Sequence, residues 1–328
     1  MKKISFVVQP FYQNNKIFDL SDDIVNRDNC MYPFYLLKER FKEVGYNLST
    51  QDINSIEDST VVLYNEMPKD IPLQKDKNKS YLLLFESELI RPDNWDTNKH
   101  QYFNKIFTWK DDIVDDIKYI KFNFAQEIPK KIDKDINKKE KLCTLIAGNK
   151  KNSHPLELYS KRVEAIQWFE KYHPNDFDFY GIGWDKYASS NRYLNTLLKK
   201  VPLSPIYKSY KGKVKNKNNT LKKYKFAICY ENARDISGYI TEKIFDCFFA
   251  TCVPVYWGAD NISEHIPKEC FIDKHEFTSY EELYTYMINM PEEEYMEYLN
   301  NIEKYLQSEK VYEYSSDFFA KRLMESII

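Results

Sequence analysis

The chain has 328 residues, of which 43% are hydrophobic, 16% aromatic and 30% charged. That length favours two domains, and that hydrophobic content excludes a disordered chain. Its 48 Lys and Arg residues nearly balance its 50 Asp and Glu residues, and the resulting net charge of −2 excludes a basic coat for nucleic acid.

Short, nearly continuous apolar runs recur along the chain, as is typical of strands buried on both faces of a parallel sheet. These runs predict strands at 4–8, 60–64, 81–85, 106–109, 142–146, 177–180, 226–230, 253–257 and 271–273. Helical spacing of apolar residues predicts helices at 155–172, 241–250, 281–288, 292–306 and 316–328. Pro155 suits the opening turn of the first of these helices. The alternation of strands and helices favours an α/β fold.

A charged segment at 130–141 has few large apolar residues and is typical of a linker. We therefore expect an N-terminal domain over 1–138, a C-terminal domain over 139–305, and a final helical segment, 306–328, that packs back toward the first domain. A second polar segment, 208–225, contains eight lysines and no acid. A solvated loop is its simplest interpretation, and the interleaved tyrosines leave RNA binding as an alternative.

No apolar run is long enough for a signal sequence or a membrane span. The run at 4–8 is too short, and the run at 244–257 is interrupted by Asp246, Thr251 and Pro254 and falls short of the about 18 residues that a span needs. We therefore expect a soluble protein. The six cysteines form no CxxC motif and the five histidines show no ligand spacing, so we expect reduced thiols and no metal site.

The segment 226–260 carries the clearest signs of chemistry. A predicted buried strand ends at Glu231 and Asn232, and ligands bind beyond the carboxyl ends of strands in open parallel sheets. After a polar loop, a helix is predicted to begin near Thr241, whose hydroxyl can cap it. This succession of strand, loop and helix predicts a ligand site at the start of the helix.

Lys243 is out of place in the first turn of that helix. The helix macrodipole disfavours a cation there by about 0.3 to 1 kcal/mol. A bound anion would reverse the effect, because free backbone N–H groups, the dipole and the ammonium would all favour it, and a diphosphate is the natural candidate. An ion pair with Asp235, Asp246 or another nearby acid would also relieve the cost, and the residues alone leave both readings open.

Three elements of this segment together resemble the signature of the α-1,3/4-fucosyltransferases, glycosyltransferase family 10. They are Tyr230-Glu231-Asn232, Tyr239-Ile240-Thr241-Glu242-Lys243 and Val253-Pro254-Val255-Tyr256-Trp257-Gly258. Ala233 departs from the family pattern, which has Ser or Thr there. The resemblance is strongest over 205–285 and is to the short soluble bacterial or viral members. It implies a GT-B fold: two Rossmann-like domains facing across a cleft, with the nucleotide on the second.

The resemblance also implies an activity, the inverting transfer of L-fucose from GDP-β-L-fucose to a glycan hydroxyl, with O3 of GlcNAc expected for an α-1,3-fucosyltransferase. Tyr239, Glu242 and Lys243 would contact the donor. Lys243 would neutralise the diphosphate, and Glu242 would bind sugar hydroxyls and stabilise the developing oxocarbenium ion. Glu231 and Asn232 belong to the same donor-binding signature.

Two further elements resemble family features on the donor side. The segment 142–152 resembles a strand followed by an S-N loop, which assigns Asn149 and the helical Arg162 to the donor site, with Arg162 on phosphate. A surface ion pair is the alternative for Arg162. Gly181 and Gly183 resemble a Y-G-x-G element, for which a plain turn is an equal reading. The lysine segment 208–225 gains a third interpretation, a loop that closes over the sugar nucleotide.

An inverting transfer needs a general base on the acceptor hydroxyl, which the N-terminal domain should supply. The run Tyr81–Glu88 is a predicted strand that ends in a loop with two acids, and it resembles the family's F-E-S-P element. Glu86 is therefore the expected base. Glu88 stands where the family has Pro, so it remains an alternative.

The partners expected from this reading are a GDP-sugar and an oligosaccharide acceptor of the lipid-linked or lipopolysaccharide type, and not nucleic acid. No tightly bound cofactor is expected, and nothing in the sequence requires the divalent cation that could stimulate the reaction. We expect a cytoplasmic protein, with peripheral attachment at the membrane as the alternative. Another GDP-sugar donor and a non-catalytic glycan- or nucleotide-binding module remain rival functions. The sequence leaves the oligomeric state and the choice between α-1,3 and α-1,4 linkage open.

Overall fold

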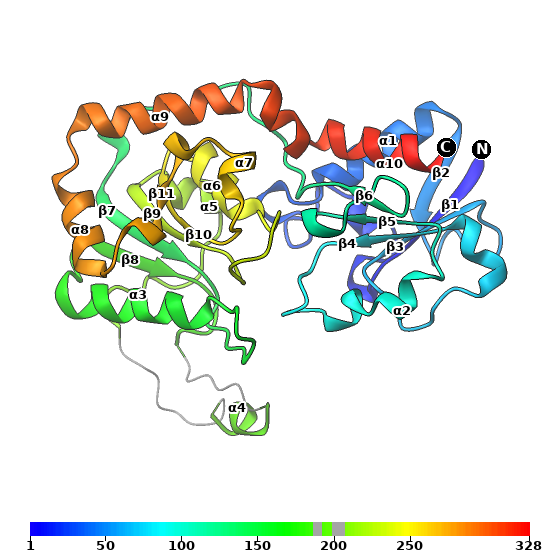
Figure 1. Cartoon of the computed structure of the whole chain (residues 1–328), viewed down its shortest axis with the longest axis horizontal. Coiled ribbons are helices and arrows are strands. Elements are labelled where there is room, and N and C mark those ends of the chain that lie inside the picture. Colours follow the sequence, from blue (N-terminus) through cyan, green and yellow to red (C-terminus); the bar gives the residue numbers. More distant parts are fainter. Residues whose placement is uncertain (186–191, 199–206) are drawn as a thin grey trace. The chain divides into compact units, whose positions relative to one another are not determined.

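The structure, a computed structural model, describes residues 1–185, 192–198 and 207–328 (Figure 1). The chain divides into two compact units. Unit 1 consists of Met1–Ile128, Ser237–Tyr239 and Ser308–Ile328, and unit 2 of Pro129–Ile236 and Ile240–Gln307. Each unit contains one sheet, and every strand pair in both sheets is parallel.

Unit 1 is built on a six-stranded sheet with the order β2-β1-β3-β4-β5-β6. Its strands are β1 (Lys2–Val7), β2 (Tyr46–Thr50), β3 (Val61–Asn65), β4 (Ser80–Leu84), β5 (Lys105–Thr108) and β6 (Tyr119–Lys121). Its helices are α1 (Tyr32–Glu43), α2 (Thr97–His100) and α10 (Ser316–Ile327). All five residues of β4 are buried, and the apolar run from Tyr81 to Leu84 within it predicts this.

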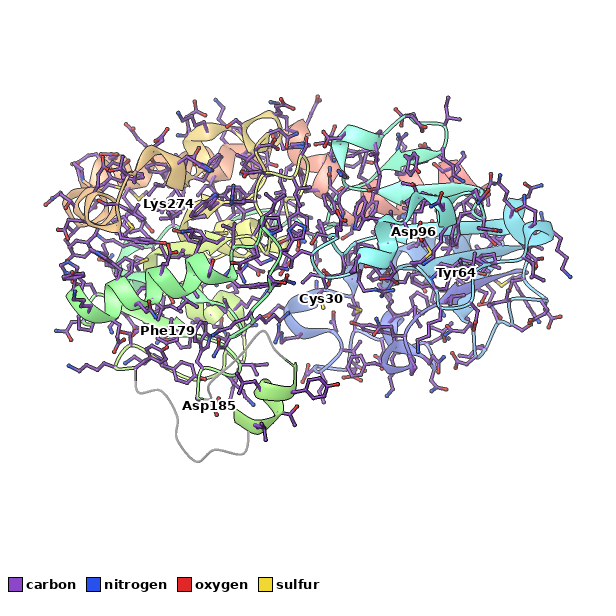
Figure 2. All side chains as sticks on the ribbon, turned by 60° about the horizontal axis from the view of Figure 1, so that its bottom comes forward. Cys30, Tyr64, Asp96, Phe179, Asp185 and Lys274 are labelled. Atoms are coloured by element: carbon purple, nitrogen blue, oxygen red, sulfur yellow. The ribbon has the colours of Figure 1, made fainter. Side chains whose placement is uncertain are left out.

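The final helix, α10, packs on α1 within unit 1 (Figure 1). The rings of Phe34 and Phe319 meet edge to face with centroids 5.8 Å apart, and Arg40 donates to Asp317 at 3.0 Å. On the sheet itself, Tyr64 is buried among Leu82, Leu84 and their neighbours (Figure 2). Because this core is closed by residues from both ends of the chain, unit 1 needs its C-terminal segment to bury its apolar surface.

Unit 2 is built on a five-stranded sheet with the order β11-β10-β9-β7-β8. Its strands are β7 (Lys141–Ile146), β8 (Phe177–Tyr180), β9 (Tyr224–Tyr230), β10 (Val253–Trp257) and β11 (Ile272–Asp273). Its helices are α3 (Tyr159–Tyr172), α4 (Arg192–Leu198), α5 (Lys217–Leu221), α6 (Glu242–Phe249), α7 (Ile262–His265), α8 (Tyr280–Asn289) and α9 (Glu292–Leu306). Helices α3 and α9 run along opposite sides of this sheet (Figure 1). The core includes Phe179, which is fully buried (Figure 2).

The α/β fold with parallel sheets confirms the prediction from the sequence, and each predicted strand has its counterpart. The strands β2 and β6 and the helix α1 were not predicted. β2 has the sequence YNLST and lacks a continuous apolar run, yet its last three residues are buried. The reason lies outside the strand, since β2 pairs with β1 and contacts α1. Asn15 also exchanges hydrogen bonds of 2.9 and 3.0 Å with Thr50.

Two predicted segments differ from the structure. Helix α3 begins at Tyr159, not at Pro155, because the preceding residues pair with the loop after β9: Leu158 N–H donates to the Asn232 carbonyl at 3.0 Å. The segment 130–141 is anchored on unit 2, where Lys134 pairs with Glu303, and the break between the units falls at 128/129.

The lysine segment 208–225 also differs from its simplest interpretation as a solvated loop. It forms α5 and the first residues of β9, and it buries Leu221 and Tyr224.

Candidate functional site

The centre of the candidate site lies at the carboxyl end of β9 in unit 2. Glu231 continues the strand, since its N–H donates to the Trp257 carbonyl at 2.8 Å. Its side chain is 0% exposed. Gly258 makes room for it, because a Cβ at that position would lie 2.6 Å from Glu231 Cγ and 2.4 Å from the Tyr256 hydroxyl. A carboxylate is thus fully buried at the edge of the sheet, where it needs hydrogen-bond donors.

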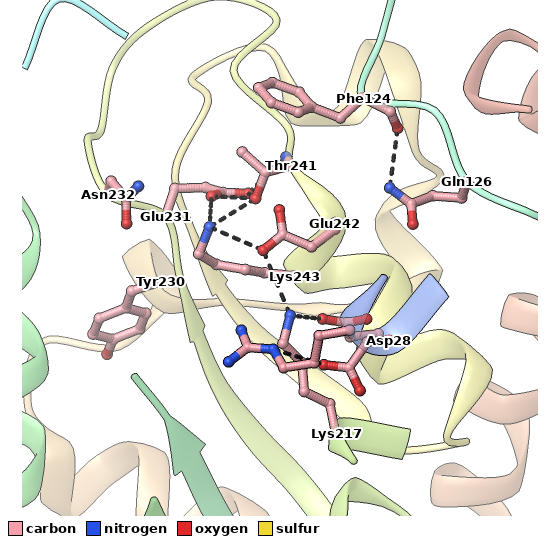
Figure 3. Close-up of polar contacts among 12 residues, drawn as sticks. Asp28, Phe124, Gln126, Lys217, Tyr230, Glu231, Asn232, Thr241, Glu242 and Lys243 are labelled. Atoms are coloured by element: carbon pink, nitrogen blue, oxygen red, sulfur yellow. Dashed lines mark hydrogen bonds and ion pairs between the residues drawn. The ribbon is translucent and has the colours of Figure 1, made fainter. Parts of the chain in front are cut away.

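Thr241 and Lys243 supply those donors (Figure 3). The Glu231 carboxylate accepts hydrogen bonds from the Thr241 N–H at 2.8 Å, from the Thr241 hydroxyl at 2.8 Å and from the Lys243 ammonium at 2.9 Å. Thr241 is the residue that precedes α6, as predicted, but its hydroxyl makes no capping hydrogen bond to the helix. The prediction of a threonine cap is wrong because the buried carboxylate takes that hydroxyl instead.

The ammonium of Lys243 is held in place at the start of α6. Besides Glu231, it donates to the Thr241 hydroxyl at 2.8 Å and lies 3.9 Å from a Glu242 carboxylate oxygen. Glu231 is therefore the nearby acid that the sequence left open beside Asp235 and Asp246. The Lys243 side chain keeps 24% of its surface exposed, so the pair with Glu231 orients the cation without enclosing it.

Glu242 and Lys217 add two further charged groups beside Lys243. Lys217, from α5, lies 2.7 Å from Asp246 and 3.6 Å from Glu242. Burial alone would raise the pKa of Glu242, but the ammonium groups of Lys243 and Lys217 hold that pKa below its usual range. Burial lowers the pKa of Lys217, but Glu242 and Asp246 outweigh it and raise that pKa. The Glu242 carboxylate, 40% exposed, is therefore ionised at neutral pH and can accept hydrogen bonds.

Arg162 and Asn232 lie together beside Glu231. The Arg162 side chain is buried, with the residue 5% exposed, so its alternative reading as a surface ion pair is wrong. Nη2 donates to the Tyr230 carbonyl at 2.6 Å and to the Asn232 amide oxygen at 3.1 Å. The structure thus groups Arg162, Asn232, Glu231 and Lys243 around the end of β9, and Arg162 fixes the loop that follows this strand.

Asn149 lies at the same edge of the sheet, after β7, but its hydrogen bonds go in another direction. Its side-chain amide donates to the Gly183 carbonyl at 3.0 Å and its N–H to the Ile182 carbonyl at 2.9 Å. Gly181, at φ 144°, approaches the same loop so closely that a Cβ there would lie 1.8 Å from the Ala147 carbonyl oxygen. In the Y-G-x-G element, Gly181 therefore allows the chain after β8 to lie close to the chain after β7.

Tyr239 belongs to unit 1, although it is only two residues from Thr241. Its ring is 1% exposed and packs against Trp109 and Phe124, with centroid distances of 4.7 and 6.1 Å. Gly238, at φ 77°, permits the chain to lie close to Trp109, since a Cβ there would lie 2.3 Å from the Trp109 carbonyl oxygen. Tyr239, which the sequence predicts to contact the donor, is thus buried in an aromatic cluster.

The candidate base Glu86 also lies in unit 1, in the loop after β4. It is half-buried, whereas Glu88 is exposed. The carbonyl of Glu86 accepts from the Trp95 indole at 3.1 Å and from the Asn94 amide at 3.3 Å. Its N–H donates to a carboxylate oxygen of Glu66 at 2.9 Å. The backbone of Glu86 is therefore held from both sides, which favours it over Glu88 as a fixed group.

Sequence reasoning missed Lys217 and Glu66. Lys217 stands in the lysine-rich segment, where nothing in the residue pattern distinguishes it from its neighbours. Glu66 directly follows the predicted strand 60–64, and an acid at the carboxyl end of a buried strand is the signal that could have found it.

Within the described ranges, 1–185, 192–198 and 207–328, no group of three or more His, Cys, Asp or Glu side chains has a metal-binding arrangement. Among those same residues, no helix combines the length and apolarity needed to cross a bilayer.

Solved structures share this fold. A crystal structure of an α1,3-fucosyltransferase with GDP matches with a TM-score of 0.56 and 15% identity over 99% of this chain and 90% of that one. An α-glucosyltransferase in complex with UDP and a 13-mer DNA matches with a TM-score of 0.59 and 11% identity over 100% of this chain and 99% of that one. The two parallel-sheet units therefore define a fold of the GT-B glycosyltransferase class, as predicted.

Residues 136–322, more than half of the chain, match the model of glycosyltransferase family 10 (fucosyltransferase), C-terminal part. The chain belongs to this family, which confirms the resemblance seen in the sequence. A segment of 74 residues is 39% identical to an α-(1,3)-fucosyltransferase of Helicobacter pylori, and covers 23% of this chain and 15% of that protein. A segment of 123 residues is 30% identical to 4-galactosyl-N-acetylglucosaminide 3-α-L-fucosyltransferase 9 of Mus musculus, and covers 36% of this chain and 34% of that protein. The matched segments thus span about a third or less of these relatives.

Proposed function

We propose that this protein transfers L-fucose from GDP-β-L-fucose to a hydroxyl of a glycan acceptor, with inversion at the anomeric carbon. The observation that carries the proposal is the cluster of Glu231, Thr241 and Lys243 at the start of α6. It fixes a partly exposed ammonium beside the N–H groups of a helix start, and this is an arrangement that favours a diphosphate. Membership of family 10 supports fucose as the transferred sugar.

The geometry in unit 2 supports the proposed donor-binding roles. Lys243 would neutralise charge on the diphosphate as it leaves with GDP. Glu242, ionised and two-fifths exposed, would accept hydrogen bonds from sugar hydroxyls and stabilise the positive charge that develops on the fucose ring. Glu231 and Arg162 are too buried to be first choices as ligands, so we propose that they position Lys243 and Asn232.

Glu86 would act as the general base. As the bond between the fucose C1 and the phosphate oxygen of GDP breaks, the acceptor oxygen forms its bond to C1 and its proton passes to the Glu86 carboxylate. The products are the fucosylated glycan, GDP and protonated Glu86, which returns its proton to water. The half-burial and the clamped backbone of Glu86 support this assignment over Glu88.

Calorimetry with GDP together with a transfer assay tests the proposal. We expect GDP to bind, fucose to pass from GDP-fucose to an acceptor in a screen that includes N-acetyllactosamine, and linkage analysis to report the position attacked. Binding without transfer to any acceptor would favour a non-catalytic module, and transfer from a different GDP-sugar would overturn the donor assignment. Failure to bind GDP would refute all three functions.

Two variants test the residue roles. Lys243→Ala should weaken GDP binding by about 1 to 3 kcal/mol, the range of a charge-assisted hydrogen bond. Glu86→Gln should abolish transfer with GDP affinity unchanged, whereas Glu88→Gln should retain transfer. If Glu88→Gln alone abolished transfer, Glu88 would be the base. The acceptor of the lipid-linked or lipopolysaccharide type and the cytoplasmic location belong to this proposal and are tested by the acceptor screen and by cell fractionation.

A further inference from the structure

Glu66 is a buried acid in unit 1 that the proposed mechanism does not use. It directly follows β3 and is 8% exposed. Its backbone adopts a left-handed conformation, φ 74°, which residues with a Cβ rarely take. Its N–H donates to the Leu83 carbonyl at 2.9 Å, so that the backbone at Glu66 stays paired with β4. A disfavoured conformation at a buried charge points to a role that the surrounding structure enforces.

The Glu66 carboxylate binds the loop that carries Glu86. One of its oxygens accepts hydrogen bonds from the N–H groups of Phe85 and Glu86, at 3.2 and 2.9 Å. Its other oxygen accepts from the side-chain amide of Asn94. The described partners of this carboxylate are all donors, an arrangement that suits the ionised form.

Asn94 joins the two sides of this arrangement. It is fully buried, and its amide oxygen accepts from the Met67 N–H at 2.9 Å. Its amide nitrogen faces both Glu66 and the Glu86 carbonyl, which also accepts from Trp95. The peptide groups on each side of the Glu86 Cα are thus fixed by side chains from other segments.

We propose that Glu66 is the positioning residue of the candidate base: its carboxylate fixes the Glu86 N–H directly and the Glu86 carbonyl through Asn94. The proposal rests on the proposed function, in which Glu86 takes the acceptor's proton. A misplacement of about 1 Å in a catalytic group lowers turnover by about a hundredfold, so the backbone clamp has a measurable consequence.

Several ionisable groups face this pair of acids. Arg91, from the turn after Glu86, donates to the Met67 carbonyl at 2.9 Å and pairs with Asp93. His100 contacts the Asn94 carbonyl at 2.7 Å. On the Glu86 side, the segment after β1 contributes Tyr12, whose pKa is raised by burial and by the charges of Cys30 and Glu86. Burial raises the pKa of Glu66 to about 7, although its hydrogen bonds with Glu86 N–H and Asn94 and the charge of Arg91 lower it.

The test compares Glu66→Gln with the reciprocal variant Glu66→Gln/Asn94→Asp. In the single variant, two amide nitrogens face each other and the charge is lost. In the double variant, the new glutamine amide can donate to the new carboxylate, and the charge returns one side chain away. Asp70→Asn, which removes an exposed acid after the same strand, is the matched control.

We expect Glu66→Gln to lower kcat by about a hundredfold, with the KM for the acceptor and the affinity for GDP unchanged, because the displaced group acts in the chemical step. The double variant should regain at least about tenfold in kcat. A kcat of Glu66→Gln within twofold of the wild type, a loss of kcat accompanied by an equal loss of GDP affinity, or no recovery in the double variant would overturn the proposal. If Glu66→Gln fails to fold, the folded double variant still decides: we expect its kcat to lie within about tenfold of the wild type with KM and GDP affinity unchanged, and a kcat about a hundredfold lower would overturn the proposal.

Glu86→Gln separates this proposal from the proposed function. If Glu86→Gln removes transfer and Glu66→Gln does not affect it, only the role of Glu66 is refuted. If transfer persists in Glu86→Gln, the base assignment fails and the role of Glu66 fails with it. In the Glu86→Gln background, Glu66→Gln should not lower the residual rate further, since the two residues act as one unit.

Discussion

The pair of Glu231 and Lys243 should behave as a single energetic unit, because the carboxylate is 0% exposed and the ammonium is its charged partner at 2.9 Å. Among the described residues, Lys243→Met leaves the buried negative charge with the N–H and hydroxyl of Thr241 as its donors. Removal of one partner of a buried pair costs about 3 to 5 kcal/mol, and we expect about 3 here because the ammonium is partly in water. Glu231→Gln, which weakens charge-assisted hydrogen bonds, should cost about 2 kcal/mol.

The double variant should be no less stable than Lys243→Met alone, since glutamine can still accept from Thr241 and no buried charge is left. The interaction energy from this cycle is then at least about 2 kcal/mol. Urea unfolding of the full chain at pH 7.5 measures the three variants, and Lys304→Met, on the exposed side of α9, controls for the loss of a lysine. Additive single effects would refute the reasoning, because they would mean that the two side chains do not depend on each other.

GDP titration of the same variants separates positioning from direct binding. If Glu231 only positions Lys243, Glu231→Gln should weaken GDP binding in the wild-type background and have no effect in the Lys243→Met background. Equal weakening in both backgrounds would show that Glu231 contacts the nucleotide itself.

Gly238→Ala should destabilise unit 1 by about 2 kcal/mol or more in thermal unfolding, since both the φ of 77° and the Trp109 carbonyl oppose a Cβ. The control Gly45→Ala, at φ 84° with no atom within 4 Å, should cost only about 1 kcal/mol. Because burial raises the pKa of Glu66 from 4.5 to about 7, its contribution to stability is complete below pH 4.5 and is lost as the pH rises through 7. The wild type should therefore lose about 3 kcal/mol relative to Glu66→Gln between pH 4.5 and 8 in urea unfolding, and a constant difference would contradict this. Phe319→Ala should cost about 3 to 5 kcal/mol, because its ring is 1% exposed and packs in the core of unit 1, while the exposed Lys321→Ala should change the unfolding midpoint little.

The segments that the sequence predicts well are those whose burial is local in origin. Strands β4 and β9 are apolar apart from Ser80 and Lys225, so their residues alone indicate burial on both faces. The start of α6 was predicted within a residue, because a polar loop changes there to helical spacing. By contrast, β2 is largely polar in sequence, and its burial comes from its pairing with β1 and its contacts with α1, which no pattern within the strand indicates.

The same distinction applies to the candidate site. The row from Thr241 to Lys243 is contiguous and could be found as a motif, but the acid that holds Lys243 could not be chosen among several candidates. Glu231 is twelve residues away in sequence, and only the approach of Gly258 and the pairing of β9 with β10 bring it to the ammonium. Long-range packing thus decides which of these side chains meet, whereas the sequence alone shows which side chains are available.

Both units contain the same arrangement. A buried carboxylate directly follows a parallel strand and accepts hydrogen bonds from N–H groups of another segment of the candidate site. Glu231 binds Thr241 N–H, and Glu66 binds the N–H groups of Phe85 and Glu86. They differ in charge compensation, since Glu231 touches an ammonium at 2.9 Å, whereas the hydrogen bonds that Glu66 accepts come from backbone N–H groups and an amide. Burial accordingly raises the pKa of Glu66 to about 7. Changes of pH near neutrality should therefore act on the hydrogen bonds that position Glu86.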